Sequence, residues 1–337
     1  MAKNKYRNSD ESFDVSKFNV KIIVIGYGYY GESTVILFMD GETVFYSLVI
    51  DSFHYLENRG FLTPFINKTA DILHEYHVER IDVLCWTHPH DDHSKGFPRL
   101  ISKYCDRATK VVFPMYLQLN SVDIVRYGVV SKCNLRLILE KNKKHEASAV
   151  PIGVADNADH NIDEFYIKDL YSSDTIARIR VDAITPISSR LTEFVNDNLC
   201  RDPNELSVSL VIDINGYGLY FGGDTKNNHI ERAKHSLMKR CRFVKIPHHA
   251  SSTANKLTLY LPPELDAVCT TVFKNGSSLL PDTTVIDKYR RFNTDIYSTD
   301  KDYGNGKYPF GIIEYSYDFS GGLPVVTPSC FGNGGII

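Results

Sequence analysis

THPHDDHSKG, residues 87–96, decides how this chain is interpreted. The stretch contains three histidines and two aspartates within six positions. It follows directly on residues 81–86, an apolar run short enough for a buried strand, and its proline and glycine mark it as a loop. Open α/β sheets place their ligand sites in loops at the carboxyl ends of strands, so we expect a site here.

The spacing of these side chains suits a metal ion. If the loop curls, the imidazoles of His88 and His90 can converge on one cation, while Asp92 and His93 face a neighbouring position. Imidazole and carboxylate ligands favour zinc, manganese or iron. The alternative is a polar surface loop that is rich in histidine by chance, which the total of 12 histidines in the chain disfavours.

Two later stretches carry further candidate ligands. Asp224 follows a predicted strand and two glycines, which allow backbone and ion to approach closely. Its carboxylate would bridge two ions or complete one site, and an ordinary helix N-cap is the alternative. His248 and His249 follow another short apolar strand. One imidazole would bind metal and the other would donate a proton to a leaving oxygen, and the sequence leaves open which does which.

Together these stretches resemble the metallo-β-lactamase fold superfamily. Residues 88–96 match its pattern HxHxDHxxG. The order that follows, NELSVSLV at 204–211, YFGGD at 220–224 and PHHAS at 247–251, is similar to the soluble hydrolase domain of ComEC/Rec2 competence proteins. The resemblance extends over about residues 19–317. It implies an α/β (α+β) fold, an αββα sandwich of two mixed sheets flanked by helices, and metal-dependent hydrolysis, most often of phosphodiesters.

The site expected from this resemblance has ligand, catalytic and substrate-binding residues. One or two Zn²⁺ or Mn²⁺ ions would be held by His88, His90, Asp92, His93, Asp224 and His248. We expect Asp92 and His249 to be catalytic, with His249 protonating the leaving alkoxide. Lys95, Ser251 and Ser252 are the expected substrate-binding residues.

The chain also departs from the family pattern. The superfamily usually supplies another histidine between the first loop and the Gly-Asp motif, but only His145 and His160 lie in this interval. Leu-Leu-Pro at 279–281 stands where a late histidine ligand is common. Ala250 replaces a glycine, and tyrosines at 29–30 replace polar residues of a glycine-rich turn. The sequence therefore leaves the first metal site without an identified third ligand.

The composition is that of an ordinary globular protein. Of its 337 residues, 43% are hydrophobic and 23% charged, and a net charge of −3 predicts no global basic field for nucleic acid. The seven cysteines are scattered and lack CxxC spacing, which favours reduced thiols and a cytoplasmic location. No apolar run has the length of a signal core or a transmembrane helix, so we expect no membrane association.

We expect one hydrolase domain over residues 18–318. A flexible N-terminus, 1–17, would precede it, and a C-terminal tail, 319–337, would cap it or hang free. The least regular part of the sequence, about 103–175, predicts a variable helical insertion.

Apolar spacing and turn signals predict individual elements within this domain. Helices are expected over 64–80 and 227–240. Asn-Gly at 215–216 predicts a hairpin between strands at 206–214 and 219–223.

Several polar residues outside the main motifs have two interpretations. We expect Asp51, at the end of an apolar strand, to brace the histidine loop, and a plain strand-end aspartate is the alternative. The histidines on the two predicted helices, His74 and His77 on the first and His229 and His235 on the second, are expected to be solvated.

These observations lead to three hypotheses about function. The first is a phosphodiesterase or nuclease that acts on DNA, RNA or a nucleotide through a metal-activated hydroxide. The second is hydrolysis of a small ester, lactone or cyclic nucleotide in the same site. The third, motivated by the missing histidines, is a degenerate binding or regulatory module that works with a protein partner in a larger system, such as a defence system.

Overall fold

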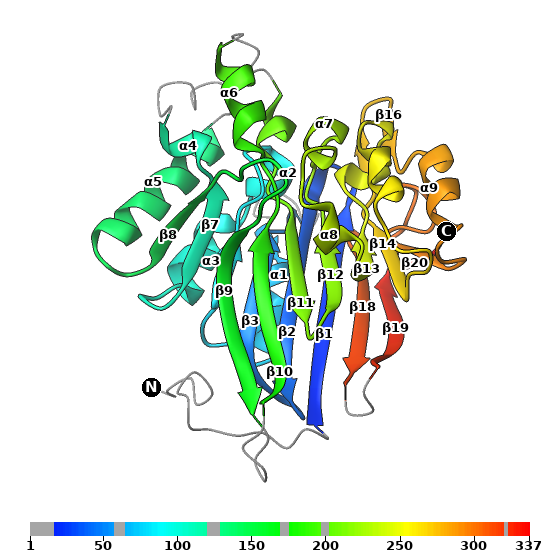
Figure 1. Ribbon diagram of the computed structural model, residues 1–337, viewed down its shortest axis with the longest axis horizontal. Helices are drawn as coiled ribbons and strands as arrows, with labels where there is room; N and C mark the ends of the chain where they lie inside the picture. The colour runs from blue at the N-terminus through cyan, green and yellow to red at the C-terminus, as the bar shows by residue number, and fades with distance from the viewer. Residues whose placement is uncertain (1–16, 57–64, 120–128, 169–174, 197–201, 320–322) are drawn as a thin grey trace.

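The computed structural model describes residues 17–56, 65–119, 129–168, 175–196, 202–319 and 323–337. The predicted flexible N-terminus therefore lies almost entirely outside the described residues. Within them, two eight-stranded sheets account for most of the strands (Figure 1).

The first sheet combines antiparallel and parallel pairing. Its strand order is β19-β18-β1-β2-β3-β6-β7-β8, antiparallel from β19 to β3 and parallel from β3 to β8. The strands are β1 (Phe18–Tyr27), β2 (Gly31–Asp40), β3 (Thr43–Asp51), β6 (Val83–Cys85), β7 (Lys110–Pro114), β8 (Ser148–Ile152), β18 (Gly311–Asp318) and β19 (Val325–Gly332). The loop 87–96 therefore follows a parallel strand in the middle of this sheet.

The second sheet is also mixed. Its order is β20-β17-β14-β13-β12-β11-β10-β9, and the strands from β17 to β12 run parallel. The strands are β9 (His160–Lys168), β10 (Thr175–Ala183), β11 (Leu210–Ile214), β12 (Tyr217–Phe221), β13 (Cys241–Lys245), β14 (Ala267–Thr270), β17 (Ile296–Ser298) and β20 (Gly335–Ile336). Asn215 and Gly216 both have positive φ, 53° and 89°, as a tight hairpin turn requires, and the predicted β11–β12 hairpin is confirmed.

Helices and short hairpins surround the two sheets. The helices are α1 (Lys68–Glu75), α2 (Asp91–Ser94), α3 (Phe97–Tyr104), α4 (Tyr116–Leu119), α5 (Val129–Lys143), α6 (Ser188–Asn196), α7 (Asn227–Ile230), α8 (His235–Met238) and α9 (Thr283–Tyr289). The 3-10 segments are η2 (Gly28–Tyr30), η4 (Pro203–Leu206), η5 (His248–Ala250) and η6 (Ser252–Leu259). Two small hairpins pair β4 (His54–Leu56) with β5 (Phe65–Asn67) and β15 (Phe273–Asn275) with β16 (Ser278–Leu280).

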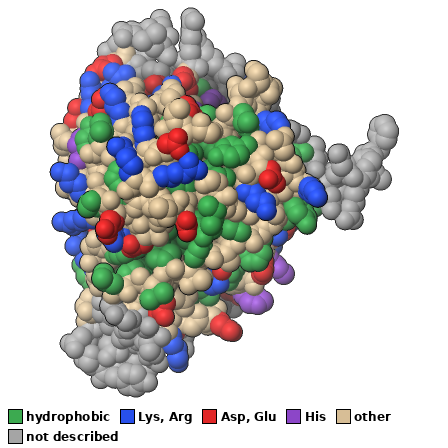
Figure 2. Space-filling view, turned by 90° about the vertical axis from the view of Figure 1, so that its right-hand side faces the viewer, with side chains coloured by type: hydrophobic (Ala, Val, Ile, Leu, Met, Phe, Trp, Pro, Cys, Tyr) green, Lys and Arg blue, Asp and Glu red, His purple; other side chains and the backbone are tan. Residues whose placement is uncertain are grey.

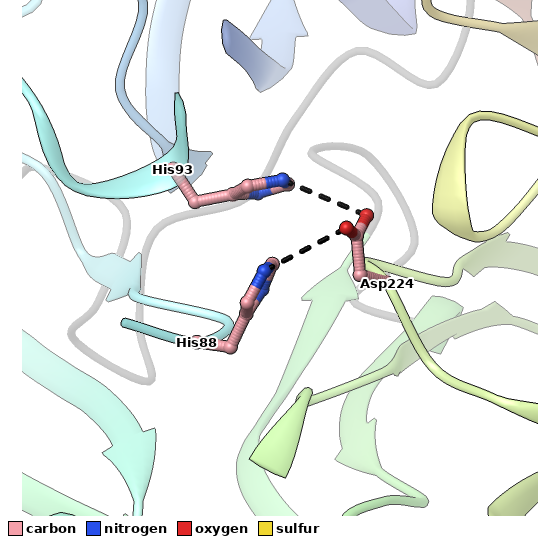
Figure 3. Close-up of side chains that lie close together, drawn as sticks. All are labelled: His88, His93 and Asp224. Carbon is pink, nitrogen blue, oxygen red and sulfur yellow. Dashed lines mark ion pairs between the residues drawn. The ribbon is translucent and has the colours of Figure 1, made fainter. Parts of the chain in front are cut away.

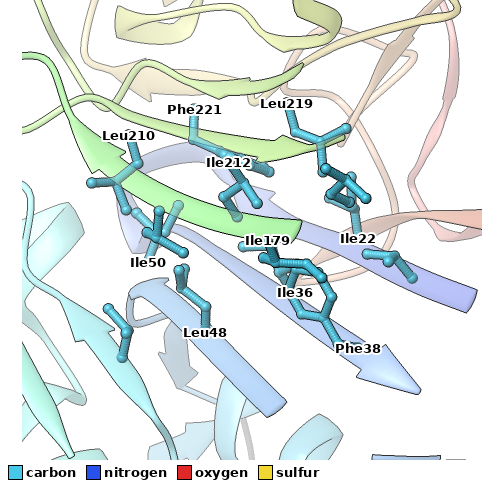
Figure 4. Packing of buried hydrophobic residues seen from close by; sticks show 14 of the residues in the cluster. Ile22, Ile36, Phe38, Leu48, Ile50, Ile179, Leu210, Ile212, Leu219 and Phe221 are labelled. Carbon is cyan, nitrogen blue, oxygen red and sulfur yellow. The ribbon is translucent and has the colours of Figure 1, made fainter. Parts of the chain in front are cut away.

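Three clusters of buried side chains define the layers. The first lies between the sheets, where residues such as Ile36 and Leu48 of one sheet face Ile179 and Leu210 of the other (Figure 4). The second packs α1, α3 and α5 on the outer face of the first sheet, and the third packs α7, α8, η6 and α9 on the outer face of the second. The order of layers is helices, sheet, sheet, helices. The predicted α/β class with two mixed sheets and helices is confirmed.

Several predicted elements differ from the structure. The expected helical insertion, about 103–175, contains α5 but also supplies β7, β8 and β9 to the sheets. The expected tail, 319–337, contributes β19 to the first sheet and β20 to the second, because each pairs antiparallel with a strand already at the sheet edge.

Three predicted boundaries in the helices and strands are also wrong. The helix predicted over 64–80 is confined to α1. The strand predicted from 206 begins at Leu210, because Pro203 starts a 3-10 turn. The helix predicted over 227–240 is broken into α7 and α8. At the break, Nε2 of His235 lies 2.9 Å from the carbonyl oxygen of Ile230, which in a continuous helix would accept a hydrogen bond from a backbone N–H.

None of the helices among the described residues is long and apolar enough to cross a membrane.

Candidate metal centre

Parallel strands of both sheets deliver the candidate ligands to one place. In the first sheet, β6 is followed by the loop that begins at Thr87 and contains α2. In the second, β12 leads to Asp224 and β13 leads to His248 and His249. Gly222 allows these two connections to approach, since a Cβ atom there would lie 2.4 Å from Cβ of Pro247. The short helices α2 and α7, which lie within these connections, are found at the same end of the molecule (Figure 1).

One carboxylate oxygen of Asp224 faces the first group of imidazoles. Oδ2 lies 3.6 Å from Nε2 of His88 and 3.8 Å from Nε2 of His248. Nε2 of His88 lies in turn 3.2 Å from Nδ1 of His90. His248, a ligand predicted from the sequence, therefore lies beside this oxygen, and its Nε2 also lies 3.1 Å from Nδ2 of Asn204.

The other oxygen of Asp224 faces a second group. Oδ1 lies 3.5 Å from Nε2 of His93 and 3.7 Å from Nε2 of His249. Oδ2 of Asp92 is 3.6 Å from the same nitrogen of His93 and 3.7 Å from that of His249. Figure 3 shows the rings of His88 and His93 pointing toward Asp224, each paired with a different carboxylate oxygen. The carboxylate therefore lies between two clusters of nitrogen and oxygen atoms.

Three atoms of the second group are buried without a hydrogen-bond partner among the described residues: Nε2 of His93, Oδ1 of Asp224 and Nε2 of His249. Unsatisfied buried polar atoms are costly, so their convergence indicates a group that they hold in common. Ligand atoms of a tetrahedral zinc ion with bonds of about 2.0–2.1 Å are roughly 3.3–3.4 Å apart, close to the separations found here. The residues therefore fit a divalent cation.

The loop histidine His93 is oriented by Asp51, as predicted. Oδ2 of Asp51 lies 2.7 Å from Nδ1 of His93. The same carboxylate accepts hydrogen bonds from the backbone N–H of Thr87 at 2.8 Å and from its hydroxyl at 2.7 Å. With Nδ1 donating its proton to Asp51, Nε2 of His93 is left to face the cluster.

A second brace, on His249, was not predicted. Nδ1 of His249 lies 2.9 Å from the hydroxyl of Thr271, which donates to Oε2 of Glu32. The other oxygen of Glu32 pairs with Nζ of Lys245, and both side chains are 3% exposed. Gly31, whose φ is 108°, brings Glu32 to the site, because a Cβ atom at Gly31 would lie 1.8 Å from the carbonyl oxygen of Asp92. The glycine-rich turn therefore borders the metal loop.

Potential ligand atoms come close together in three sets of described residues: His88, His93 and Asp224; Asp92, His93 and His249; and Glu32, Asp51 and His93. In the last set, the nitrogen of His93 that faces both carboxylates is Nδ1. These atoms are already used, since Asp51 bonds to His93 and Glu32 bonds to Lys245 and to Thr271. This group is therefore a supporting layer for the other two groups.

Burial and neighbouring charges shift the protonation of the cluster. Burial, with the neighbouring histidines, places the pKa of His88 well below its usual value. Burial also lowers the pKa of His93, but Asp224, Asp92 and Asp51 together hold it well above its usual value. For Asp92, burial alone would raise the pKa, but His93 and His249 outweigh this effect, so the pKa of Asp92 lies below its usual value. The lowered pKa of Asp92 favours its charged form beside the histidines, and a buried negative charge attracts positive charge.

The predicted substrate-binding residues lie in different surroundings. Lys95 lines a cavity of about 520 Å³ above the cluster, together with Asp92, Asp224 and His249. Ser251 is buried and caps η6 by accepting from the N–H of Thr253, and neither it nor the exposed Ser252 lines this cavity.

The remaining histidines divide into solvated and structural ones. His74 and His77 are exposed, as predicted. His145 is exposed and His160 opens β9, and neither belongs to a group of potential ligands among the described residues. The expectation of a solvated His229 is wrong: it is 1% exposed, because the backbone N–H of Ile187 donates to its Nδ1 at 3.0 Å and holds the ring inside.

No protein-family model matches this chain, and no curated protein is detectably similar to it.

Proposed function

We propose that this chain is a metal-dependent phosphodiesterase with the metallo-β-lactamase fold, and that it takes Zn²⁺ or Mn²⁺. The observation that carries the proposal is the position of Asp224, whose two oxygens face the Nε2 atoms of four imidazoles, two to each oxygen. The order of layers, the motif HxHxDHxxG and the loop after a parallel strand support the family assignment.

These distances support an assignment of the ligands to two ions. The first ion would be held by His88, His90, His248 and Oδ2 of Asp224. The second would be held by Asp92, His93, His249 and Oδ1 of Asp224. In this assignment His249 is a ligand of the second ion, since its Nε2 is buried and faces two carboxylates. When bound, such ions supply Lewis acidity, which lowers the pKa of water and stabilises charge on phosphate oxygens.

The protein's own side chains prepare this site. Asp51 and Thr271 engage the Nδ1 atoms of His93 and His249, so that both rings direct Nε2 inward. Lys95 lines the cavity and would pair with a phosphate oxygen. Four imidazoles have Nε2 facing Asp224, and His248 is the most accessible of them, at 16% side-chain exposure. Its Nδ1 lies 2.8 Å from the hydroxyl of Thr253.

The proposal is tested by cleavage of single-stranded DNA and RNA with Mn²⁺ or Zn²⁺. We expect wild type to cleave, and Asp224→Ala and His90→Ala to fall to background while remaining folded. Asp71→Ala is the matched control, because this aspartate is exposed on α1. Unchanged turnover of the Asp224 variant would overturn the proposal.

A further inference from the structure

The cavity beside the candidate metal ligands has one wall that supplies none of these ligands. This wall is the β15–β16 hairpin, which supplies Phe273, Asn275 and Leu280 to the lining. Phe273 in β15 and Leu280 in β16 are paired directly opposite each other, so the two apolar residues are neighbours across the hairpin. A phosphate group is charged and would gain no favourable contact with apolar side chains, so this wall indicates that the substrate also has an apolar part.

Phe273 is held as a flat platform beside the site. Its ring stacks on that of His249 with centroids 5.2 Å apart and an interplanar angle of 30°. The backbone N–H of Asp282, just after the hairpin, donates to the carbonyl oxygen of Ala250 at 3.2 Å, and Lys274 bonds to the carbonyl oxygen of Gly304 at 2.9 Å. The hairpin is thus tied to the His-His turn on one side and to the 300–306 loop on the other.

Polar groups complete the wall. Asn204 and Asn275 line the same cavity, but Nδ2 of the buried Asn204 already lies 3.1 Å from Nε2 of His248. The exposed Asn275 offers an amide group, which can donate and accept hydrogen bonds to the edge of a nucleobase. Lys95 is the one lysine or arginine among the described lining residues. On the face seen in Figure 2, basic and acidic side chains are interspersed and form no continuous basic track for a long polyanion.

From this geometry we propose that the cavity takes a nucleotide one unit at a time, with its base stacked on Phe273 beside Leu280. The inference rests on the proposed phosphodiesterase function and adds the class of substrate. The volume of about 520 Å³ lies within the range of about 300–1,000 Å³ that is typical of small-ligand pockets. The unit would come from a dinucleotide or from the end of a single strand, since both present the same base and phosphate.

The test compares two single-stranded substrates of equal length and charge, an oligothymidylate and the same backbone with abasic sugars. With Mn²⁺, we expect wild type to cleave the base-bearing strand with a kcat/KM about fivefold to 150-fold higher, the range for one stacked base. Phe273→Leu, which keeps an apolar side chain against His249, should remove most of this preference by raising KM. Phe273→Trp should retain it.

Leu279→Ala is the control for the hairpin, because Leu279 is 44% exposed and lies outside the cavity lining. Two further substrates, a dinucleotide and a circular oligothymidylate, show where the bound nucleotide comes from. If the enzyme needs a strand end, it should leave the circular oligothymidylate uncleaved. Cleavage of both strands with equal efficiency, or a preference unchanged by Phe273→Leu, would overturn the inference alone. Failure of wild type to cleave any of these substrates would instead refute the proposed function, and the inference with it.

Discussion

Replacing Lys245 with methionine tests the buried ion pair beneath the metal centre. Lys245 and Glu32 are each 3% exposed, and Lys245 lies in β13 between apolar neighbours. Methionine keeps the length of the side chain and removes its charge, which leaves the carboxylate of Glu32 buried without its cation. Breaking one partner of a buried pair costs about 3–5 kcal/mol, so we expect the free energy of unfolding to fall by about that amount.

The measurement is urea unfolding with a chelator present, which removes any contribution from bound ions. Lys256→Met is the matched control, because Lys256 pairs with Glu231 where both side chains are more than 40% exposed. Its loss should cost at most about 1 kcal/mol.

The double variant Lys245→Met with Glu32→Gln separates charge from packing. A neutral glutamine needs no buried cation and still accepts a hydrogen bond from Thr271. We therefore expect the double variant to be more stable than Lys245→Met alone. Equal losses for the Lys245 and Lys256 variants, or a double variant no more stable than the single one, would refute the reasoning.

Three further variants test the surroundings of the site. Asp51→Asn should weaken metal affinity about 10–100-fold by loosening the orientation of its histidine partner, measured by competition with a chromophoric chelator. His249→Ala should lower the metal content, measured by mass spectrometry, whereas the exposed His74→Ala should leave it unchanged. Gly222→Ala should destabilise the fold by about 1–3 kcal/mol in urea unfolding, because its Cβ atom would meet Pro247; a midpoint equal to that of wild type would contradict this.

The parts of the site that could be predicted are those in which short sequence spacing carries the geometry. His88, His90, Asp92 and His93 share one loop, so a strand followed by a turn is enough to bring them together. Asp224 follows a glycine pair at a strand end, a local signal of the same kind. Two mixed sheets and their helices were expected from the family resemblance, whereas alternation and turn residues, which are local signals, predicted individual elements such as the β11–β12 hairpin.

Of the supporting layer, Asp51 was predicted but Glu32 was not, because the contacts of Glu32 span the chain. Glu32 and Lys245 are 213 positions apart, and only the packing of the two sheets brings them together. A lysine inside the apolar run of β13 was the one signal available, since a buried lysine needs a partner. The strand at 325–332 was missed because it depends on pairing with β18, and its own residues are largely exposed.

Some predictions from the sequence stay predictions. The cytoplasmic location, a protein partner and the choice between DNA and RNA rest on composition and on the family resemblance. The salt dependence of activity tests the kind of nucleic acid that is bound, because binding to a long polyanion weakens steeply as salt rises whereas binding of one nucleotide does not.

Metal content by mass spectrometry tests the central claim most directly. We predict about two ions per chain for wild type, because Asp224 faces two ligand groups. His88→Ala and His93→Ala should each lower the content by about one ion, and Asp224→Ala should lower it further. A wild-type protein that binds no divalent metal after purification and reconstitution, or variants that bind as much as wild type, would contradict the account.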